Sequence, residues 1–191
     1  YSSSCGGHTQ GNIFGDTKDI PYLRGSADMP ADIGMRFPLS NWDLERWLKE
    51  PPSGVYCQVG SGGRASTFRW VRVYSAEEMA AFAGGFALIG RVEKVLALER
   101  SPSGHISRLE IVGDKGRRTI ERELTIRRQL GNLRSSLFKV EVKLGPDRQP
   151  QQFIFYGGGW GHAVGMCQTG ARGMAEAGRD FRAILRHYFR N

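Results

Sequence analysis

The stretch that most constrains this chain is residues 155–168, which read Phe-Tyr-Gly-Gly-Gly-Trp-Gly-His-Ala-Val-Gly-Met-Cys-Gln. Such a density of glycine gives the backbone access to positive φ and lets a ligand or another segment approach closely. Trp160, His162 and Gln168 are interleaved among the glycines, and their side chains can stack on a polar ligand and hydrogen-bond to it. A plain strand-to-helix connection is the alternative interpretation. The fixed offsets of these three side chains favour a binding site.

The composition indicates a globular domain with a mildly basic surface. Of 191 residues, 40% are hydrophobic and 24% are charged, and no apolar run reaches the roughly 18–20 residues of a membrane span. The net charge is +8, and arginine supplies most of the positive charge. Arginine binds carboxylate or phosphate groups well, but the basic residues are scattered along the chain rather than gathered in one block. We therefore expect neither a nucleic-acid partner nor a membrane span. The sequence begins at Tyr1 without a Met, so we expect a processed or truncated product whose export signal lies outside this chain.

Hydrophobic periodicity predicts an α+β fold with a β-rich centre and peripheral helices. Ser40, Ser75 and Asp180 are expected to cap helices, and residues 137–144 alternate cleanly between apolar and polar, as a strand with one buried face does. Residues 1–191 are read as one domain, with a smaller lobe over about 85–145 as an alternative division. The segment 13–39 is expected to be extended. The expected helices are 41–50, 75–83, 125–130, 166–177 and 180–190, and the expected strands are 55–57, 68–73, several within 90–120, 137–144 and 151–156.

The three cysteines, Cys5, Cys57 and Cys167, leave their chemistry open. An odd number excludes a scaffold built only of disulfides, although one bridge and one spare thiol remain compatible with the sequence. Cys5 and His8 are three residues apart, a spacing compatible with half of a metal site or with a thiol nucleophile beside a base. A second ligand pair at short spacing is missing, so we expect no metal. His162 and Cys167 lack a third orienting group, which disfavours a catalytic pair.

A dinucleotide loop is also disfavoured. The pattern Gly159-x-Gly161-x-x-x-Gly165 follows an expected strand, but fewer than about 30 residues remain after it, too few for the βαβ unit that such a loop serves. We therefore expect no cofactor.

Several motifs together resemble the SpoIID/LytB family, that is, stage II sporulation protein D and its relatives. The resemblance runs in the same order along nearly the whole chain. It is carried by Tyr1-Ser-Ser-Ser-Cys-Gly-Gly-His-Thr, Pro21-Tyr22-Leu23-Arg24, Phe68-Arg69-Trp70, Ser103-Gly104-His105-Ile106 through Leu137-Phe138, Gly159-Trp-Gly-His-Ala-Val-Gly-Met-Cys-Gln-Thr-Gly and Ile184-Leu185-Arg186-His187-Tyr188-Phe189.

The resemblance implies a sporulation-related or cell-wall protein outside the cytoplasm that acts on peptidoglycan. SpoIID-type members are lytic transglycosylases that cut glycan strands stripped of stem peptides, with one carboxyl group serving as acid and then base. The family's glutamate lies upstream of the segment at which this chain begins, so the acid is expected to be missing here. The resemblance thus implies that residues 1–191 are the C-terminal, glycan-binding portion of a longer parent protein. LytB-type relatives suggest the alternative of a non-catalytic module that binds the cell wall and stimulates an N-acetylmuramoyl-L-alanine amidase.

The resemblance also implies a site and a disulfide. The expected substrate cleft lies between the N-terminal Ser/Cys/Gly segment and the C-terminal Gly-Trp-Gly-His segment. In the oxidising envelope, Cys5 and Cys57 are expected to form a disulfide, with Cys167 spare. The expected substrate-binding residues are Tyr1, Ser4, Gly6, Gly7, His8, Thr9, Trp160, Gly161, His162 and Gln168.

Overall fold

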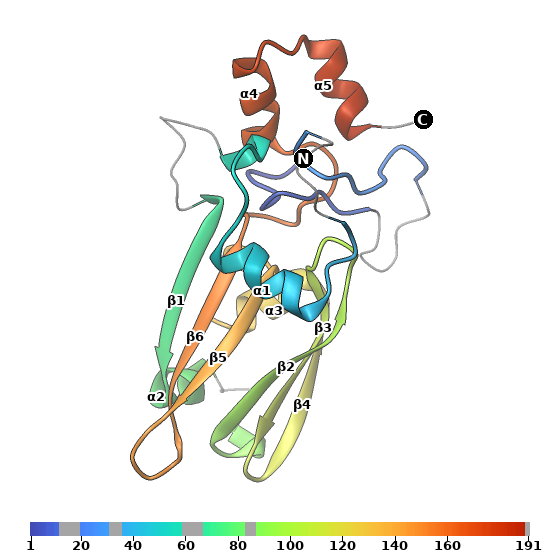
Figure 1. The fold of residues 1–191 in the computed structure, drawn as a ribbon. Helices are drawn as coiled ribbons and strands as arrows, with labels where there is room; N and C mark the ends of the chain where they lie inside the picture. The colour runs from blue at the N-terminus through green and yellow to red at the C-terminus, as the bar shows by residue number, and fades with distance from the viewer. Residues whose placement is uncertain (12–19, 31–35, 59–66, 83–86, 190–191) are drawn as a thin grey trace.

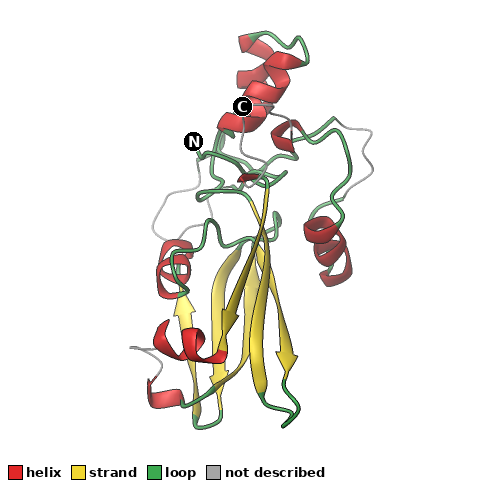
Figure 2. Ribbon diagram, turned by 90° about the vertical axis from the view of Figure 1, so that its left-hand side faces the viewer, coloured by secondary structure: helices red, strands yellow, loops and turns green. Residues whose placement is uncertain are grey.

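The structure is a computed structural model that describes residues 1–11, 20–30, 36–58, 67–82 and 87–189. Its described part holds two three-stranded antiparallel sheets and five α-helices, so the expected α+β class is confirmed. The strands lie in the lower half of the molecule, whereas loops and the two C-terminal helices make up the upper half (Figures 1 and 2). No helix among the described residues has the length and apolar character that crossing a bilayer requires.

The first sheet has the order β1-β6-β5 and carries the glycine-rich stretch at one end. Strand β6 (Pro150–Gly158) is central and pairs antiparallel with β1 (Arg69–Ser75) and β5 (Phe138–Leu144). Phe155 on β6 lies opposite Arg72 on one side and Val140 on the other. The pairing continues to Gly157 and Gly158, so the sheet delivers the chain directly into the turn at Gly159.

The second sheet, with the order β2-β3-β4, is an antiparallel meander formed by β2 (Val92–Arg100), β3 (Ile106–Gly113) and β4 (Gly116–Glu121). Its inner face shares one hydrophobic core with the first sheet. The fully or nearly buried members of this core are Trp70, Tyr74, Met79, Ile89, Val92, Ile106, Leu109, Ile111, Ile120, Ile126, Leu130, Leu133, Phe138, Phe153 and Phe155.

The helices begin at the capping residues that the sequence supplies. Ser40 caps α1 (Asn41–Lys49), Ser75 and Glu78 form a capping box on α2 (Ala76–Ala81), and Asp180 caps α5 (Phe181–Tyr188). The remaining elements are α3 (Glu123–Gln129), α4 (Gln168–Glu176) and the 3₁₀ turns η2 (Tyr56–Gln58) and η5 (Ala87–Ile89).

One expected element is wrong, and another falls partly outside the described residues. Residues 55–57 do not form a strand, because Cys57 is buried in η2 and only a single backbone bond, from Tyr56 N–H to the Asp28 carbonyl, resembles strand pairing. The β-branched and aromatic residues that suggested a strand are held instead by packing in the upper half. Part of the expected extended segment 13–39, namely residues 13–19 and 31–35, lies outside the described chain.

A second core fills the upper half. It includes Trp47 of α1 and Tyr188 of α5, and it contains all three cysteines. Its buried members are Cys5, Met29, Leu44, Trp47, Leu48, Val55, Cys57, Phe68, Leu137, Ala163, Cys167, Met174 and Tyr188.

His105, immediately before β3, makes stability depend on pH. Its imidazole is buried, and burial followed by the nearby cations lowers its pKa to about 3. Because the unfolded chain binds a proton on this side chain below about pH 6.5, stability is lost as pH falls from there toward 3 and is unaffected above it. We expect wild type to lose about 2 kcal/mol more than His105→Gln between pH 7 and pH 5. Urea denaturation at both pH values measures this difference, and equal losses would contradict the assignment.

Candidate functional site

The amino-terminal segment (residues 1–10) lies directly against the glycine-rich segment (residues 159–168). The two are joined by backbone hydrogen bonds and form isolated β-bridges. Gly159 has a φ of +80°, and a Cβ there would lie 2.8 Å from the Ser4 carbonyl oxygen, so only glycine permits this approach. The pairs are Ser2 N–H to Met166 O (3.0 Å), Ser4 N–H to Trp160 O (3.1 Å), Trp160 N–H to Ser4 O (2.8 Å), Gln10 N–H to Ala163 O (2.7 Å) and Gln168 N–H to Ser2 O (2.9 Å).

This pairing corrects the expected cleft. The two segments are not the opposite walls of an open groove, because backbone hydrogen bonds between them leave no room for a sugar polymer. They form one continuous layer instead, and the exposed side chains of this layer lie on its outer surface.

The expected site residues fall into two groups. The exposed group consists of Tyr1, Trp160, His162 and Gln168, with Gly161 half-buried between them. The buried group supports the layer from within and consists of Ser4, Gly6, Gly7, His8 and Thr9.

Trp160 is the exposed aromatic of the glycine-rich segment, with 37% of its surface accessible. The Arg134 guanidinium lies 5.2 Å from the centre of its ring, a cation–π contact. A pocket of about 330 Å³ adjoins Arg134 and is lined by Arg69, Trp70, Val71, Arg72, Asn132, Leu133 and Arg134. The surface next to Trp160 is therefore both aromatic and cationic.

Arg69 contributes to structure rather than to this surface. Its guanidinium donates to the backbone oxygens of Trp47, Gly6 and Phe68 at 2.8–3.2 Å. Burial lowers its pKa to about 10, which leaves it charged at neutral pH.

His162 is a neutral hydrogen-bonding group at this surface. Burial, followed by the nearby amino terminus and Arg127, lowers its pKa. Its Nδ1 accepts the backbone N–H of Val164 at 3.1 Å. The proton of the neutral ring is therefore on Nε2, which can act as a donor.

His8 lies apart from the thiols. Its Nδ1 is 2.6 Å from the Thr9 carbonyl oxygen, and its ring lies 4.0 Å from that of Phe37. Together with Thr9 and Phe37 it lines a pocket of about 430 Å³. The pairing of Cys5 with His8, considered and disfavoured from the sequence, is not formed, because His8 is not among the groups that converge on Cys5.

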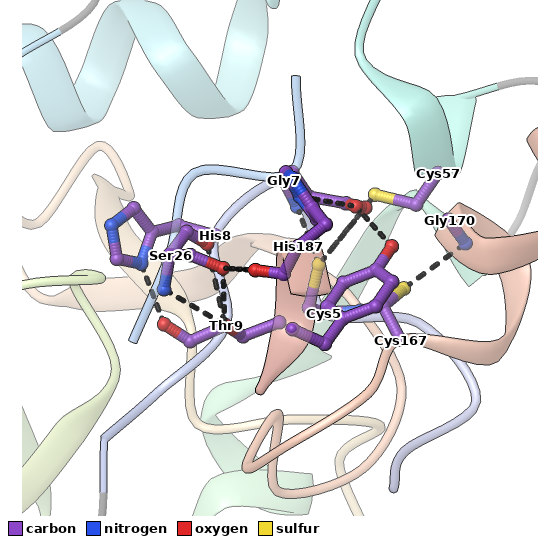
Figure 3. A network of polar contacts seen from close by, with 11 residues as sticks. Cys5, Gly7, His8, Thr9, Ser26, Cys57, Cys167, Gly170 and His187 are labelled. Carbon is purple, nitrogen blue, oxygen red and sulfur yellow. Dashed lines mark hydrogen bonds and ion pairs between the residues drawn. The ribbon is translucent and has the colours of Figure 1, made fainter. Parts of the chain in front are cut away.

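Beneath the layer, three cysteines and one aspartate converge on one point. We call Cys5, Asp28, Cys57 and Cys167 the cysteine–aspartate cluster; one sulfur or oxygen atom from each lies within 4.8 Å of every other. Figure 3 shows the sulfur atoms of the three cysteines directed toward one another. All three thiols are free, and the sulfurs of Cys5 and Cys57 are 3.8 Å apart. The expected disulfide is therefore wrong, because a disulfide requires about 2.0 Å between the sulfurs.

The pKa values of the three cysteines in this cluster are shifted in different directions. Burial, followed by hydrogen bonding to Cys167, raises the pKa of Cys5 well above its ordinary value, and burial likewise raises the pKa of Cys57. Burial alone would also raise the pKa of Cys167, but hydrogen bonds donated to its sulfur lower that pKa well below the ordinary value. Backbone N–H groups of Cys5 and Gly170 supply two of these bonds, at 3.2 and 3.3 Å.

Asp28 is fully buried, and burial raises its pKa to about 7. Its two oxygens have different partners. The Tyr188 hydroxyl donates to Oδ1 at 2.5 Å, whereas the Cys5 thiol donates to Oδ2 at 3.3 Å. A Cβ on Gly170 would lie 2.3 Å from Oδ2 and from the Tyr188 hydroxyl, so the first turn of α4 closes tightly over the carboxylate.

Sequence reasoning missed Asp28 and the meeting of all three cysteines. The four groups are separated by at least 23 residues along the chain, so no short spacing marks them. The signal that could have suggested them is three cysteines in a chain with no compelling disulfide pair.

A family described as Domain of unknown function (DUF8618) matches residues 11–165, most of the chain. The chain is a member of the DUF8618 family. A stretch of 36 residues is also 53% identical to an uncharacterized protein of Brachyspira hyodysenteriae, covering 19% of this chain and 10% of that protein. The DUF8618 match contains Asp28, Cys57 and Trp160, whereas Cys5 and Cys167 flank it.

Proposed function

We propose that this protein binds the glycan strand of peptidoglycan on the surface formed by Tyr1, Trp160, His162 and Gln168. One observation carries the proposal: the two segments that most resemble the SpoIID/LytB family lie side by side and expose these side chains together. The protein would then act in the cell envelope, outside the cytoplasm.

The chemistry of the four groups suits a sugar polymer. Tyr1, 77% exposed, and Trp160 present aromatic faces on which the C–H groups of a sugar ring can stack. The amide of Gln168 can donate to hydroxyl and acetamido oxygens, and the exposed His162 ring lies at the same surface. Arg134 beside Trp160 supplies positive charge for the lactyl carboxylate of a muramic acid that has lost its stem peptide.

Cleavage of the glycan, as a lytic transglycosylase, is proposed for the intact parent protein. It requires a carboxylic acid that reaches the glycosidic oxygen. Asp28 has the raised pKa of a general acid, but its side chain is fully buried and cannot touch a polymer on the surface. We therefore assign Asp28 no catalytic role.

Replacing Trp160 tests the binding surface. We expect Trp160→Ala to weaken binding to denuded glycan strands about tenfold or more, since truncating an aromatic anchor removes a dominant contact. The matched control is Trp42→Ala, because Trp42 is also exposed, at 75%, but lies on α1. Sedimentation of the protein with denuded peptidoglycan measures the effect. Equal binding by wild type and Trp160→Ala would show that the glycan does not bind at this surface.

A product assay separates the two roles of the parent. Denuded glycan incubated with the intact parent is expected to release anhydro-muramyl products, which mass spectrometry detects. Stimulation of an added N-acetylmuramoyl-L-alanine amidase without such products would favour the non-catalytic module instead.

A further inference from the structure

We infer that the cysteine–aspartate cluster is a structural zinc site, with Cys5, Asp28, Cys57 and Cys167 as its four ligands. This inference does not depend on glycan binding, because the cluster lies beneath the exposed surface and is buried on all sides.

The distances fit a tetrahedral ion. With a Zn–S bond of about 2.3 Å, two thiolates on one tetrahedral zinc are about 3.8 Å apart, and a thiolate and a carboxylate oxygen about 3.5 Å apart. The sulfurs of Cys5 and Cys57 are 3.8 Å apart, and the Cys5 sulfur is 3.3 Å from Asp28 Oδ2. Since every pair lies within 4.8 Å, small side-chain rotations suffice to close the remaining edges.

The number and type of ligands favour zinc over a disulfide. A disulfide between Cys5 and Cys57 would leave the ionisable groups of Cys167 and Asp28 buried without a metal ion to bind. A zinc ion, in contrast, binds all four groups. Thiolates select soft or borderline ions, and a site with four buried protein ligands has no open position for substrate. These features describe a structural rather than a catalytic centre.

The surroundings are arranged as a second layer of support. The Tyr188 hydroxyl holds Asp28 Oδ1, which leaves Oδ2 on the side of the sulfurs. Backbone N–H groups donate to the Cys167 sulfur, as described above, and that of Gly7 donates to the Cys5 sulfur at 3.4 Å. Three thiolates and one carboxylate around Zn²⁺ carry a net charge of −2. These donors offset it, together with the buried guanidinium of Arg69, which donates to the Gly6 carbonyl next to Cys5.

The ion would join four parts of the chain. Cys5 lies in the amino-terminal segment, Asp28 in a loop, Cys57 in η2 and Cys167 at the N-cap of α4. The described part of the upper half contains little regular structure outside α4 and α5. A shared ion would hold its loops together there, as hydrogen bonds between strands hold the lower half together. Binding of the ion displaces the thiol protons of Cys5 and Cys57, which are released to solvent.

Metal analysis of the full chain tests the inference. The reduced, metal-free protein is incubated with Zn²⁺, passed through a desalting column and analysed by inductively coupled plasma mass spectrometry. We expect one zinc ion per chain. With Co²⁺ in place of Zn²⁺, we expect thiolate-to-cobalt charge-transfer bands and the intense d–d bands of a tetrahedral site.

Two sets of variants test whether the zinc ion is bound by the cysteine–aspartate cluster. Cys57→Ser and Asp28→Asn should lose the stoichiometric metal, whereas His8→Gln, close to Cys5 in sequence but outside the cluster, should keep it. Because ligand variants can fail to fold, Tyr188→Phe provides a measurement with all four ligands intact, and we expect its zinc affinity to fall about 10–100-fold.

Three results would overturn the inference. They are substoichiometric zinc in a wild-type chain that circular dichroism shows to be folded, a cobalt spectrum without thiolate bands, and a zinc-exposed, non-reduced sample in which peptide mapping finds Cys5 joined to Cys57.

Discussion

Phe155→Ala is expected to lower the free energy of unfolding by about 3–5 kcal/mol, the range for truncating a fully buried phenylalanine. Phe155 is on the central strand β6, is completely buried and packs its ring against two others. The ring centres of Phe138 and Tyr74 lie 5.3 and 5.4 Å from its own. Truncation leaves a cavity between the two sheets, and neighbouring strands on both sides prevent collapse. Urea denaturation followed by tryptophan fluorescence measures the change.

Val73→Ala is the matched control. Val73 lies on β1 of the same sheet but is 49% exposed, so its truncation should cost less than about 1 kcal/mol. A loss at Val73 as large as the loss at Phe155 would show that the sheet, rather than the core between the sheets, limits stability.

Gly7→Ala is expected to cost about 2–5 kcal/mol, the sum of two effects at one position. Gly7 has a φ of +109°, where an alanine is strained, and a Cβ there would lie 2.1 Å from the Trp47 indole. Trp47 is itself buried against Phe37 and Arg69, so its ring cannot move aside freely.

Gly178→Ala separates the two effects. Gly178 also has a positive φ, +79°, but no atom lies within 4 Å of the position of a Cβ, so only the conformational cost of about 1–2 kcal/mol applies. Both variants are compared by urea denaturation. Equal losses at Gly7 and Gly178 would mean that the amino-terminal segment does not pack on Trp47 as the structure has it.

Local patterns in the sequence were sufficient for most elements. The serine caps at 40 and 75, the aspartate cap at 180 and the alternation in 137–144 predicted α1, α2, α5 and β5 to within about two residues. Such signals are carried by residues a few positions apart, which is the range over which helix capping and strand alternation act. The strand expected at 55–57 was wrong because its residues are placed by burial under α4 rather than by their own propensity.

The candidate site was predictable only in part. The glycine-rich stretch identified Trp160, His162 and Gln168 as exposed polar or aromatic groups, and they are exposed. The family resemblance placed Ser4, His8 and Thr9 at the ligand surface, yet they are buried. In a segment without regular periodicity, sequence does not reveal which side chains face inward.

By itself, the sequence determined the α+β class, the ends of most helices and the glycine-rich stretch at residues 155–168, because each follows from local backbone chemistry. Only the tertiary structure decided that residues 1–10 and 159–168 form one layer and that Cys5, Asp28, Cys57 and Cys167 meet beneath it. Groups separated by at least 23 residues come together through the packing of whole elements, and no local spacing encodes that packing.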